Sequence, residues 1–324
     1  MKIIEQSHEF LDRSDPLRLI EVAGRTCYKS EDKITDDSAM KFVTMLLEKG
    51  HTAMIEHASE CMYVDDIIYE DVLKCEDRPF INIEDDGKCK IISGNLWALK
   101  AFCREYAVNR PKIIVSAYNM MYYLACRFPW LYPESEDWNR VGVVNPWYPK
   151  QLEMLIPLYG FIRHASEDGR SPKHVWRTVK FVTNRGVTHE LVRHRPVSYA
   201  QESTRYVNYG GQDMAFVQPI WAPNLDQIAN GVSNEDESAY ANFYASCFSS
   251  AKQYKKLIDL HWPPQYAREV LPNALKTEIV VSANLPEWKH IFKMRCSKAA
   301  HPQIRELMMP VRDAFIEEFP DFFS

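Results

Sequence analysis

Most of what this sequence predicts depends on one stretch near its middle: Arg193-His194-Arg195-Pro196-Val197-Ser198-Tyr199-Ala200-Gln201-Glu202-Ser203-Thr204-Arg205. It opens with three basic side chains and continues with hydroxyl groups and a further guanidinium. Guanidinium groups bind phosphate oxygens through paired hydrogen bonds, and hydroxyls can complete the contacts to an oxyanion. The segment 185–205 holds four arginines and two glutamates, a net charge of +2 within a chain of net charge −5. The stretch therefore indicates an anion pocket, with a solvated basic face or a nucleic-acid contact as the alternatives.

The composition is that of a folded globular chain. With 324 residues, 46% of them hydrophobic and 12% aromatic, it can bury the core of one large or two modest domains. The negative net charge disfavours a protein that coats nucleic acid. No apolar run is long enough for a membrane span, and the N-terminus lacks the apolar core of a secretory signal. Eight cysteines occur without a CxxC pair, so we expect a cytoplasmic chain with reduced thiols.

Strand and helix patterns alternate in both flanks of the chain, which predicts a mixed fold. Strands are expected at 2–6, 175–182 and 275–283, where β-branched and apolar residues cluster. Helices are expected at 16–24, from caps at 35–37 to Gly50, and at 187–194, 238–260, 287–296 and 302–319. The residues around 198–205 are expected to form a loop. The apolar stripe of 238–260 is expected to lie in the core or in a subunit interface.

The segment 62–172 is interpreted as an inserted, mainly helical lobe within a single catalytic domain of 1–324. Its first part, 65–87, carries nine acids against two bases and is expected to be a solvated surface. Helices are expected from a cap at Ser93 to Tyr106, and over 113–126. Four prolines and three tryptophans between 129 and 149 predict an irregular loop.

His189, Glu190 and His194 form an HExxxH pattern, which is one residue longer than the HExxH of zinc proteases. Side chains five positions apart on a helix point about 140° apart. Two histidines in this arrangement cannot readily share one ion, so no metal site is predicted.

The Arg193–Arg205 stretch resembles the signature of the flavin-dependent thymidylate synthases. In that family RHR is followed by a serine three residues later, a second serine five residues after it, and an arginine two residues further on. Ser198, Ser203 and Arg205 stand at these places here. The resemblance extends over about 1–60 and 175–320. It includes Gly50-His51 with Glu56-His57, Ala267-Arg268 with Leu271-Pro272, and Asn284 with Arg295 eleven residues later.

The resemblance implies an α/β (α+β) fold, with a mixed sheet and flanking helices, and a homotetramer with active sites at subunit interfaces. It implies methylation of dUMP to dTMP. The carbon donor would be 5,10-methylenetetrahydrofolate, and the hydride source would be FAD reduced by NADPH. The expected partners are therefore small molecules, and neither nucleic acid nor a membrane.

The resemblance also implies roles for individual residues. Arg295 is the expected catalytic residue, because a guanidinium beside the uracil would stabilise the negative charge that develops on the ring. The residues expected at dUMP are Glu190, Arg193, Gln201, Glu202, Ser203, Thr204, Arg205, Arg268 and Arg295. The residues expected at FAD are His51, Ala53, Glu56, Arg193, His194, Arg195, Gln201, Asn284 and His290.

The sequence departs from the family pattern at a few of these positions. Ala53 and His290 stand where the family typically has a threonine and an asparagine. Glu190 and Gln201 stand where many relatives have a glutamine and a glutamate, so one amide and one carboxylate have exchanged places. We therefore expect Glu190 and Gln201 to approach one another or the same ligand.

Two other functions are open at this point. A nucleic-acid-binding protein would use the Arg193–Arg205 segment for phosphate contacts, bind in a salt-sensitive manner and be colourless. A zinc hydrolase would lose its function with a chelator. A flavoprotein would be yellow and would bleach with NADPH, so one absorbance spectrum separates the three.

Overall fold

The computed structural model describes residues 1–75, 78, 80–108, 114–132, 162–167, 170–211, 213–222 and 234–323. The chain forms two compact units, each with its own sheet. The first unit consists of Met1–Leu11, Val22–Asp32 and Thr178–Ser324, and the second of Asp12–Glu21 and Lys33–Arg177. In the described ranges, no helix is both long and apolar enough to cross a membrane.

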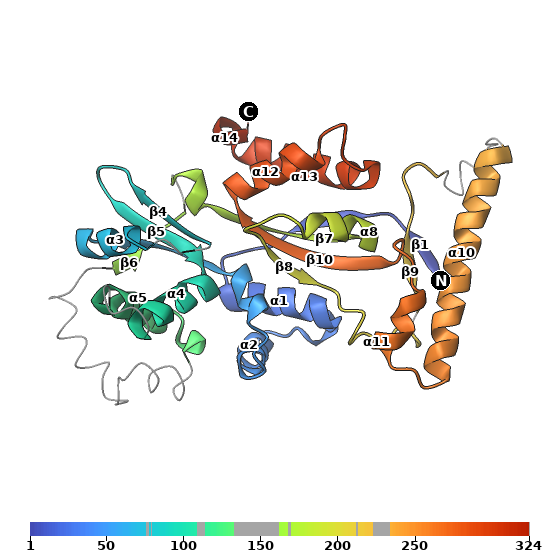
Figure 1. Cartoon of the computed structure of the whole chain (residues 1–324), viewed down its shortest axis with the longest axis horizontal. Coiled ribbons are helices and arrows are strands. Elements are labelled where there is room, and N and C mark those ends of the chain that lie inside the picture. Colours follow the sequence, from blue (N-terminus) through green and yellow to red (C-terminus); the bar gives the residue numbers. More distant parts are fainter. Residues whose placement is uncertain are drawn as a thin grey trace. The chain divides into compact units, whose positions relative to one another are not determined.

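The first unit is organised around a four-stranded sheet with the strand order β2-β7-β10-β8 (Figure 1). β2 runs antiparallel to β7, and β8 runs antiparallel to β10, while a separate parallel pair joins β1 to β9. Helices and mainly antiparallel strands occur together, which confirms the predicted α+β class. The strands are β1 Lys2–Ile4, β2 Ser7–Phe10, β7 Trp176–Asn184, β8 Ser198–Gln201, β9 Ala215–Val217 and β10 Lys276–Asn284.

The core of the first unit lies between this sheet and the C-terminal helices α12 (Leu285–Arg295) and α13 (Pro302–Glu318). The fully buried Trp288 of α12 lies with its ring 6.5 Å from that of Phe181 in β7 and 5.2 Å from that of Phe315 in α13. Burial of a side chain such as Phe315 stabilises the fold by about 1.5–3 kcal/mol. Nearly every residue of β10 is buried, as its run of β-branched residues predicts.

Two strands of the sheet end in the same way, with an asparagine that starts a helix. Asn184 ends β7, and its Oδ1 accepts a hydrogen bond from the Val187 N–H at 2.8 Å to begin α8 (Arg185–Leu191). Asn284 ends β10, and its Oδ1 accepts a hydrogen bond from the Glu287 N–H at 3.2 Å to begin α12. This side chain satisfies an N–H that would otherwise lack a partner in the first turn. Both helices therefore leave the sheet from defined positions.

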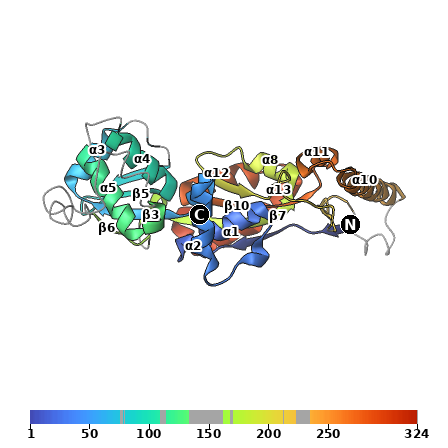
Figure 2. The same cartoon turned by 90° about the horizontal axis from the view of Figure 1, so that it is seen from below.

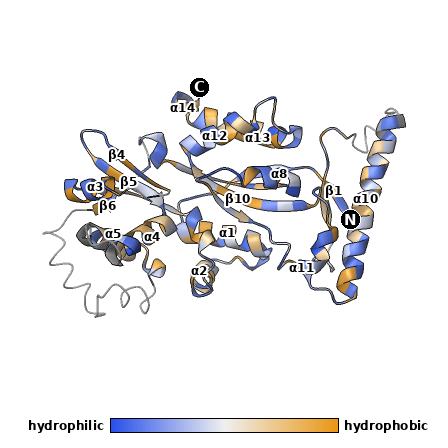
Figure 3. Ribbon diagram, in the orientation of Figure 1, coloured by the Kyte–Doolittle hydropathy of each residue, from blue (hydrophilic) through white to orange (hydrophobic). Residues whose placement is uncertain are grey.

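The long helix α10 (Asn234–Asp259) lies beside the β1–β9 pair (Figures 1 and 2). Hydrophobic residues recur along its length (Figure 3). Of the stripe predicted for it, Tyr240, Cys247 and Tyr254 are buried, and Tyr254 packs in a cluster with Phe216 of β9. Tyr244 and Phe248, in contrast, are 42% and 54% exposed. Part of the stripe therefore belongs to the core, and part of it faces outward in the single chain.

The second unit contains an antiparallel sheet with the strand order β4-β5-β3-β6. Its strands are β3 Ser59–Val64, β4 Ile81–Asp85, β5 Lys90–Asn95 and β6 Ile162–His164. Its helices include α2 Ser38–Glu48, α3 Asp66–Leu73, α4 Leu96–Val108, α5 Ile114–Arg127 and the 3-10 helix η2 Thr52–His57. The interpretation of 62–172 as an inserted lobe in one domain stays a prediction.

Several local predictions for the second unit were wrong. Ser93 does not cap a helix, because it lies in β5; α4 begins later, and Asn95 Oδ1 accepts a hydrogen bond from the Ala98 N–H at 2.7 Å. The acidic segment 65–87 is not only a solvated surface, because Ile68 and Val72 of α3 are fully buried. The predicted irregular loop begins with a short 3-10 helix, Pro129–Leu131, and from residue 133 onward it lies outside the described residues.

Two predictions in the first unit were wrong in their bounds. The helix expected at 187–194 spans Arg185–Leu191, because Asn184 rather than Gly186 ends the strand. The loop expected at 198–205 begins with β8, whose residues pair with Ile279–Ser282 of β10. Other predicted elements are confirmed: β1, β7, β10, α2, α5, α10, α12, α13 and α1, which spans Pro16–Tyr28. After α10 follow α11 Pro264–Ala267 and the 3-10 helix η6 Arg268–Val270.

Candidate active site

The C-terminal ends of α8 and α12 meet at Arg295. Its Nε donates to Nε2 of His194 at 2.9 Å. Its Nη1 donates to the Glu190 carboxylate and its Nη2 to the Glu190 carbonyl, both at 2.7 Å. The HExxxH pattern is thereby explained, because Glu190 and His194 share an arginine. Within the described residues, no group of three or more His, Cys, Asp and Glu side chains is placed to hold a metal ion.

His194 is held as a neutral acceptor in this arrangement. Burial lowers its pKa to about 4, and the positive charges of Arg295 and of a protonated His290 lower it as well. The ring of His290 lies 5.5 Å from that of His194 in an edge-to-face arrangement. Tyr199 donates from its hydroxyl to the Leu191 carbonyl at 2.7 Å, which fixes the turn after α8. A guanidinium has five N–H donors, and these contacts use three of them. Arg295 is therefore immobilised with hydrogen-bonding capacity to spare.

Gln201 and Glu190 have different partners. The Gln201 amide donates to the hydroxyls of Thr188, at 2.9 Å, and Thr277, at 3.3 Å, whereas the Glu190 carboxylate binds Arg295. The expected approach of Glu190 and Gln201 is therefore not seen as a direct contact.

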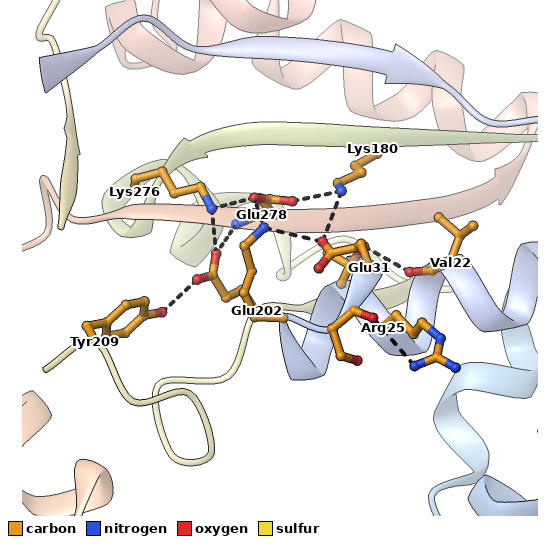
Figure 4. A network of polar contacts seen from close by, with 11 residues as sticks. Val22, Arg25, Glu31, Lys180, Glu202, Tyr209, Lys276 and Glu278 are labelled. Atoms are coloured by element: carbon orange, nitrogen blue, oxygen red, sulfur yellow. Dashed lines mark hydrogen bonds and ion pairs between the residues drawn. The ribbon is translucent and has the colours of Figure 1, made fainter. Parts of the chain in front are cut away.

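Glu202 belongs to a closed network of charges (Figure 4). Its carboxylate accepts hydrogen bonds from the Tyr209 hydroxyl at 2.7 Å, from Lys276 at 3.0 Å and from the Glu278 N–H at 3.2 Å. Glu278 is bound in turn by Lys29, Lys180 and Lys276. Its burial would raise its pKa, but hydrogen bonds from these lysines hold that pKa well below its usual range. The carboxylate of Glu202, predicted at dUMP, is thus occupied within the chain.

Four other residues predicted at the nucleotide, Ser203, Thr204, Arg205 and Arg268, differ in exposure and in their partners. Ser203 donates its N–H to the Cys27 carbonyl at 2.9 Å, and its hydroxyl accepts from the Arg205 N–H at 3.3 Å. Thr204 is buried, while Arg205 is exposed. The Arg268 guanidinium lies 3.5 Å from the Glu269 carboxylate. No direct contact between Arg205, Arg268 and Arg295 is seen among the described residues.

The residues predicted at FAD are distributed over both units. His51, Ala53 and Glu56 lie at the start of η2 or within it, in the second unit. The others lie in the first unit, where Asn284 caps α12 and His290 is exposed. Arg193 and Arg195 are exposed, and the guanidinium of Arg195 donates to the Val192 carbonyl at 2.6 Å. The assignment of these residues to the flavin stays a prediction.

Sequence reasoning missed Arg185, the first residue of α8. Burial lowers the pKa of its guanidinium, and the positive charge of Arg268 lowers it as well, while the Glu202 carboxylate raises it. Its place between the strand predicted to end at Val182 and the helix predicted to begin at Val187 gave no signal of a role.

In the second unit, a serine, a histidine and a glutamate are spaced as in the catalytic triad of a hydrolase, but the serine and the histidine are not accessible to solvent. Ser93 Oγ lies 2.8 Å from His174 Nδ1, and Glu84 Oε2 lies 2.9 Å from His174 Nε2. Ser93 and His174 are both fully buried. Burial also lowers the pKa of His174 to about 4. Since no substrate can reach the hydroxyl, this group of three side chains is structural.

Comparisons with known proteins match the segments of the chain that carry the resemblance. The profile of the thymidylate synthase complementing protein family matches residues 9–67 and 152–321. The flavin-dependent thymidylate synthase of Mycobacterium marinum is 33% identical over 172 residues, which are 51% of this chain and 68% of that protein. The enzyme of the same name from Geobacter sulfurreducens is 36% identical over 124 residues, which are 38% of this chain and 49% of that protein.

Among solved structures, the UMP/dUMP methylase PolB from Streptomyces cacaoi, bound with 5-Br UMP, aligns with a TM-score of 0.43 and 12% identity. The alignment covers 100% of this chain and 94% of that one. The sequence matches confirm the predicted enzyme class, a methyltransferase, and support a flavin as its cofactor. Since the family profile covers more than half of the sequence, the chain belongs to the thymidylate synthase complementing protein family, that of the flavin-dependent thymidylate synthases.

Proposed function

We propose that this protein methylates dUMP to dTMP, with 5,10-methylenetetrahydrofolate as the carbon donor and FAD, reduced by NADPH, as the hydride source. The observation that carries the proposal is the immobilised guanidinium of Arg295, held by Glu190 and His194 at the meeting point of α8 and α12. The relatives of this chain that are named flavin-dependent thymidylate synthases support the proposed substrate and cofactor.

Arg295 would act on the base of the nucleotide. Its remaining N–H donors can bind a uracil carbonyl, or N3 once it has lost its proton, and its charge would stabilise the negative charge that develops on the ring. Because its orientation is fixed before the substrate arrives, little reorganisation is needed at the moment of reaction. His194 keeps Nε2 as an acceptor for Arg295 while it is neutral. The chain thus supplies positioning and charge for the reaction.

The donor set near α8 is suited to a dinucleotide such as FAD. Arg193 and Arg195 are two positions apart, exposed and cationic, and such side chains can pair with the phosphates of FAD. A bound flavin would supply the hydride chemistry that no side chain offers. We propose that Arg193 and Arg195 hold the phosphates of FAD, with His51, Ala53, Glu56, His194, Gln201, Asn284 and His290 as the further residues implied by the resemblance.

We further propose a homotetramer with active sites at subunit interfaces. The partly exposed apolar stripe of α10, with Tyr244 and Phe248, is compatible with a subunit contact. Light scattering of the purified protein tests the assembly directly, and a monomer would contradict it. The expected cytoplasmic location stays a prediction.

The function is tested by the absorbance spectrum and by product formation. We expect a yellow protein that bleaches with NADPH and that forms dTMP from dUMP only when 5,10-methylenetetrahydrofolate is also present. A colourless protein that binds nucleic acid in a salt-sensitive manner would support the alternative use of the Arg193–Arg205 segment. A flavoprotein that leaves dUMP unchanged under these conditions would contradict the proposed reaction but not the cofactor.

A further inference from the structure

A cavity of about 720 Å³ is lined only by residues of the second unit. Its walls are formed by residues between 13 and 19, by the start of β3, by the end of α5 with the residues after it, and by the end of β6 with the residues after it. A cavity of this size can hold a small organic ligand. None of the residues predicted at dUMP or at FAD lines it. The cavity is therefore a candidate for a second ligand site.

One wall of the cavity is organised by the carboxylate of Glu60, whose side chain is 3% exposed. The carboxylate accepts hydrogen bonds from the Tyr123 hydroxyl at 2.7 Å, from Arg127 Nε at 3.0 Å and from His164 Nδ1 at 2.7 Å. Tyr123 and Arg127 are four residues apart in α5, so they lie on one face of that helix. Burial raises the pKa of Tyr123, and the negative charge of Glu60 raises it further, so the hydroxyl keeps its proton. Glu60 thus fixes side chains from α5 and β6.

The contact with Glu60 determines which nitrogen of His164 is available to a ligand. A carboxylate has no proton to donate, so Nδ1 of His164 is the donor in this hydrogen bond. In a neutral imidazole the other nitrogen, Nε2, is then an acceptor. No described residue donates to it. The side chain of His164 is 49% exposed and lines the cavity, so a ligand can reach it.

Arg127 presents the complementary hydrogen-bonding groups. Its Nε is bound to Glu60, while its two terminal nitrogens have no acceptor among the described residues. Its guanidinium carbon lies 5.5 Å from the ring centre of Phe128, and the rings of Phe128 and Trp130 meet edge to face at 5.9 Å. These three side chains all line the cavity. The wall therefore offers donors on Arg127, an acceptor on His164 and aromatic rings beside them.

The charges around the cavity favour a neutral ligand. The charged groups that line it are three carboxylates and two guanidiniums, those of Asp15, Glu60, Glu167, Arg13 and Arg127. With a neutral His164, three negative and two positive groups give a formal charge of −1. Arg13 is already bound to the Ser59 hydroxyl at 2.6 Å and to the His57 carbonyl at 3.1 Å. A phosphorylated ligand would therefore meet no surplus of positive charge, whereas a neutral ligand needs none.

We propose that this cavity binds a neutral, planar heterocycle that carries a carbonyl next to an N–H, as the bases of thymidine and inosine do. The carbonyl accepts from the terminal nitrogens of Arg127, the N–H donates to Nε2 of His164, and the ring packs against Phe128 and Trp130. Because Arg127 and His164 bind the same carboxylate, they match a donor and an acceptor that are neighbours in the ligand. The site is additional to the proposed function and does not depend on it.

The test uses diethyl pyrocarbonate, which modifies unprotonated imidazole nitrogens, on the purified full chain, with the modified histidines identified by mass spectrometry. Without ligand, His164 should react as the exposed His261 does, and the fully buried His174 should not react. Saturating thymidine or inosine should slow the reaction of His164 at least about fivefold and leave that of His261 unchanged. The matched ligand control is 3-methylthymidine, which keeps the ring and the carbonyls but lacks the N–H, and it should slow the reaction less than about twofold.

A pair of variants tests the donors of Arg127. Arg127→Lys keeps a positive charge beside Glu60 but loses the planar set of donors, so the nucleoside concentration for half-maximal protection of His164 should rise at least about tenfold. Arg312→Met, at an arginine that pairs with Asp313, is the matched control and should leave that concentration unchanged. The melting temperature without ligand shows whether Arg127→Lys is folded, and the comparison of nucleosides on wild type stands without this variant.

Four results would each overturn the proposal. They are a failure of both nucleosides to protect His164, equal protection by 3-methylthymidine, protection by inorganic phosphate alone, and a His164 that reacts no faster than His174. The relative protection by thymidine and inosine shows whether the site prefers a pyrimidine or a purine. Formation of dTMP is not measured in this experiment, so its outcome is separate from that of the proposed function.

Discussion

Two groups of charged side chains in the first unit are built in opposite ways. Around Glu278 and Glu202, three lysines and a tyrosine close every contact inside the chain (Figure 4). At Arg185, the buried Nη1 has no hydrogen-bond partner among the described residues, and the positive charge of Arg268 opposes that of the guanidinium while the Glu202 carboxylate favours it. A satisfied network stabilises and specifies the fold, whereas unsatisfied charge indicates a ligand. The difference separates a network that neutralises its own charges from a charged donor that has no partner among the described residues.

The largest expected effect comes from removing the Glu278 carboxylate from the network of charges around Glu202 and Glu278. Glu278→Gln leaves Lys29, Lys180 and Lys276 without their shared carboxylate. Removing one partner of a buried ion pair typically costs about 3–5 kcal/mol of unfolding free energy. Urea denaturation at pH 7 measures it. Glu317→Gln, at an exposed position, is the control and should change the unfolding free energy by less than about 0.5 kcal/mol.

The pH dependence of this loss has a definite sign. Glu278 has a pKa below its ordinary value of 4.5, so its charge stabilises the fold above that pH, and this stabilisation is lost as the pH falls through the folded-state pKa. The difference between wild type and Glu278→Gln should therefore be greatest above pH 4.5 and shrink in more acidic solution. A difference that stays constant with pH would mean that the carboxylate charge has no part in the stability.

His194 gives a smaller pH effect at the candidate site. Its pKa is lowered from 6.5 to about 4, so the unfolded chain binds a proton that the folded chain excludes between these two values. Stability should fall as the pH is lowered from 6.5 towards 4, by roughly 1–3 kcal/mol after allowance for partial solvation. Urea denaturation of wild type and His194→Gln across this range measures the slope. The same slope in both proteins would assign it to other groups.

The structure shows why some features of the fold could be predicted from the sequence and others could not. β10 and α12 were predicted because a buried apolar run and an apolar periodicity are local properties of Lys276–Arg295. The closed state of Glu202 could not be predicted, because it depends on Lys276, 74 residues away. The sheet of the second unit was missed because its strands are short and lie within acidic or mixed segments.

In the candidate site, too, some features could be predicted from the sequence and others could not. The signature predicted that Arg193–Arg205 and Arg295 belong to one function, and the contact of Arg295 with His194 brings the two segments together. The signature did not predict Arg185, because a missing hydrogen-bond partner is a property of three-dimensional packing. Nor did spacing explain Glu190, whose partner lies 105 residues away.

The smallest expected effect on stability, and the one of opposite sign, comes from a substitution of Arg185. Arg185→Met removes a guanidinium whose buried Nη1 has no hydrogen-bond partner among the described residues, so the unfolding free energy without ligand should stay unchanged or rise by about 1 kcal/mol. Urea denaturation in the absence of dUMP measures it. A loss of unfolding free energy as large as that of Glu278→Gln would contradict the contrast between Arg185 and the network around Glu278.

The central claim, that Arg295 serves the chemistry at the base of the nucleotide, is tested most directly by one reaction. Purified Arg295→Ala, loaded with flavin and reduced, is mixed with dUMP and 5,10-methylenetetrahydrofolate in a single turnover, and dTMP is measured over time. We expect the variant to keep its flavin and to form dTMP about 100- to 1,000-fold more slowly than wild type, as for the loss of a donor that stabilises transition-state charge. A wild-type rate in a folded, flavin-loaded variant would contradict the account.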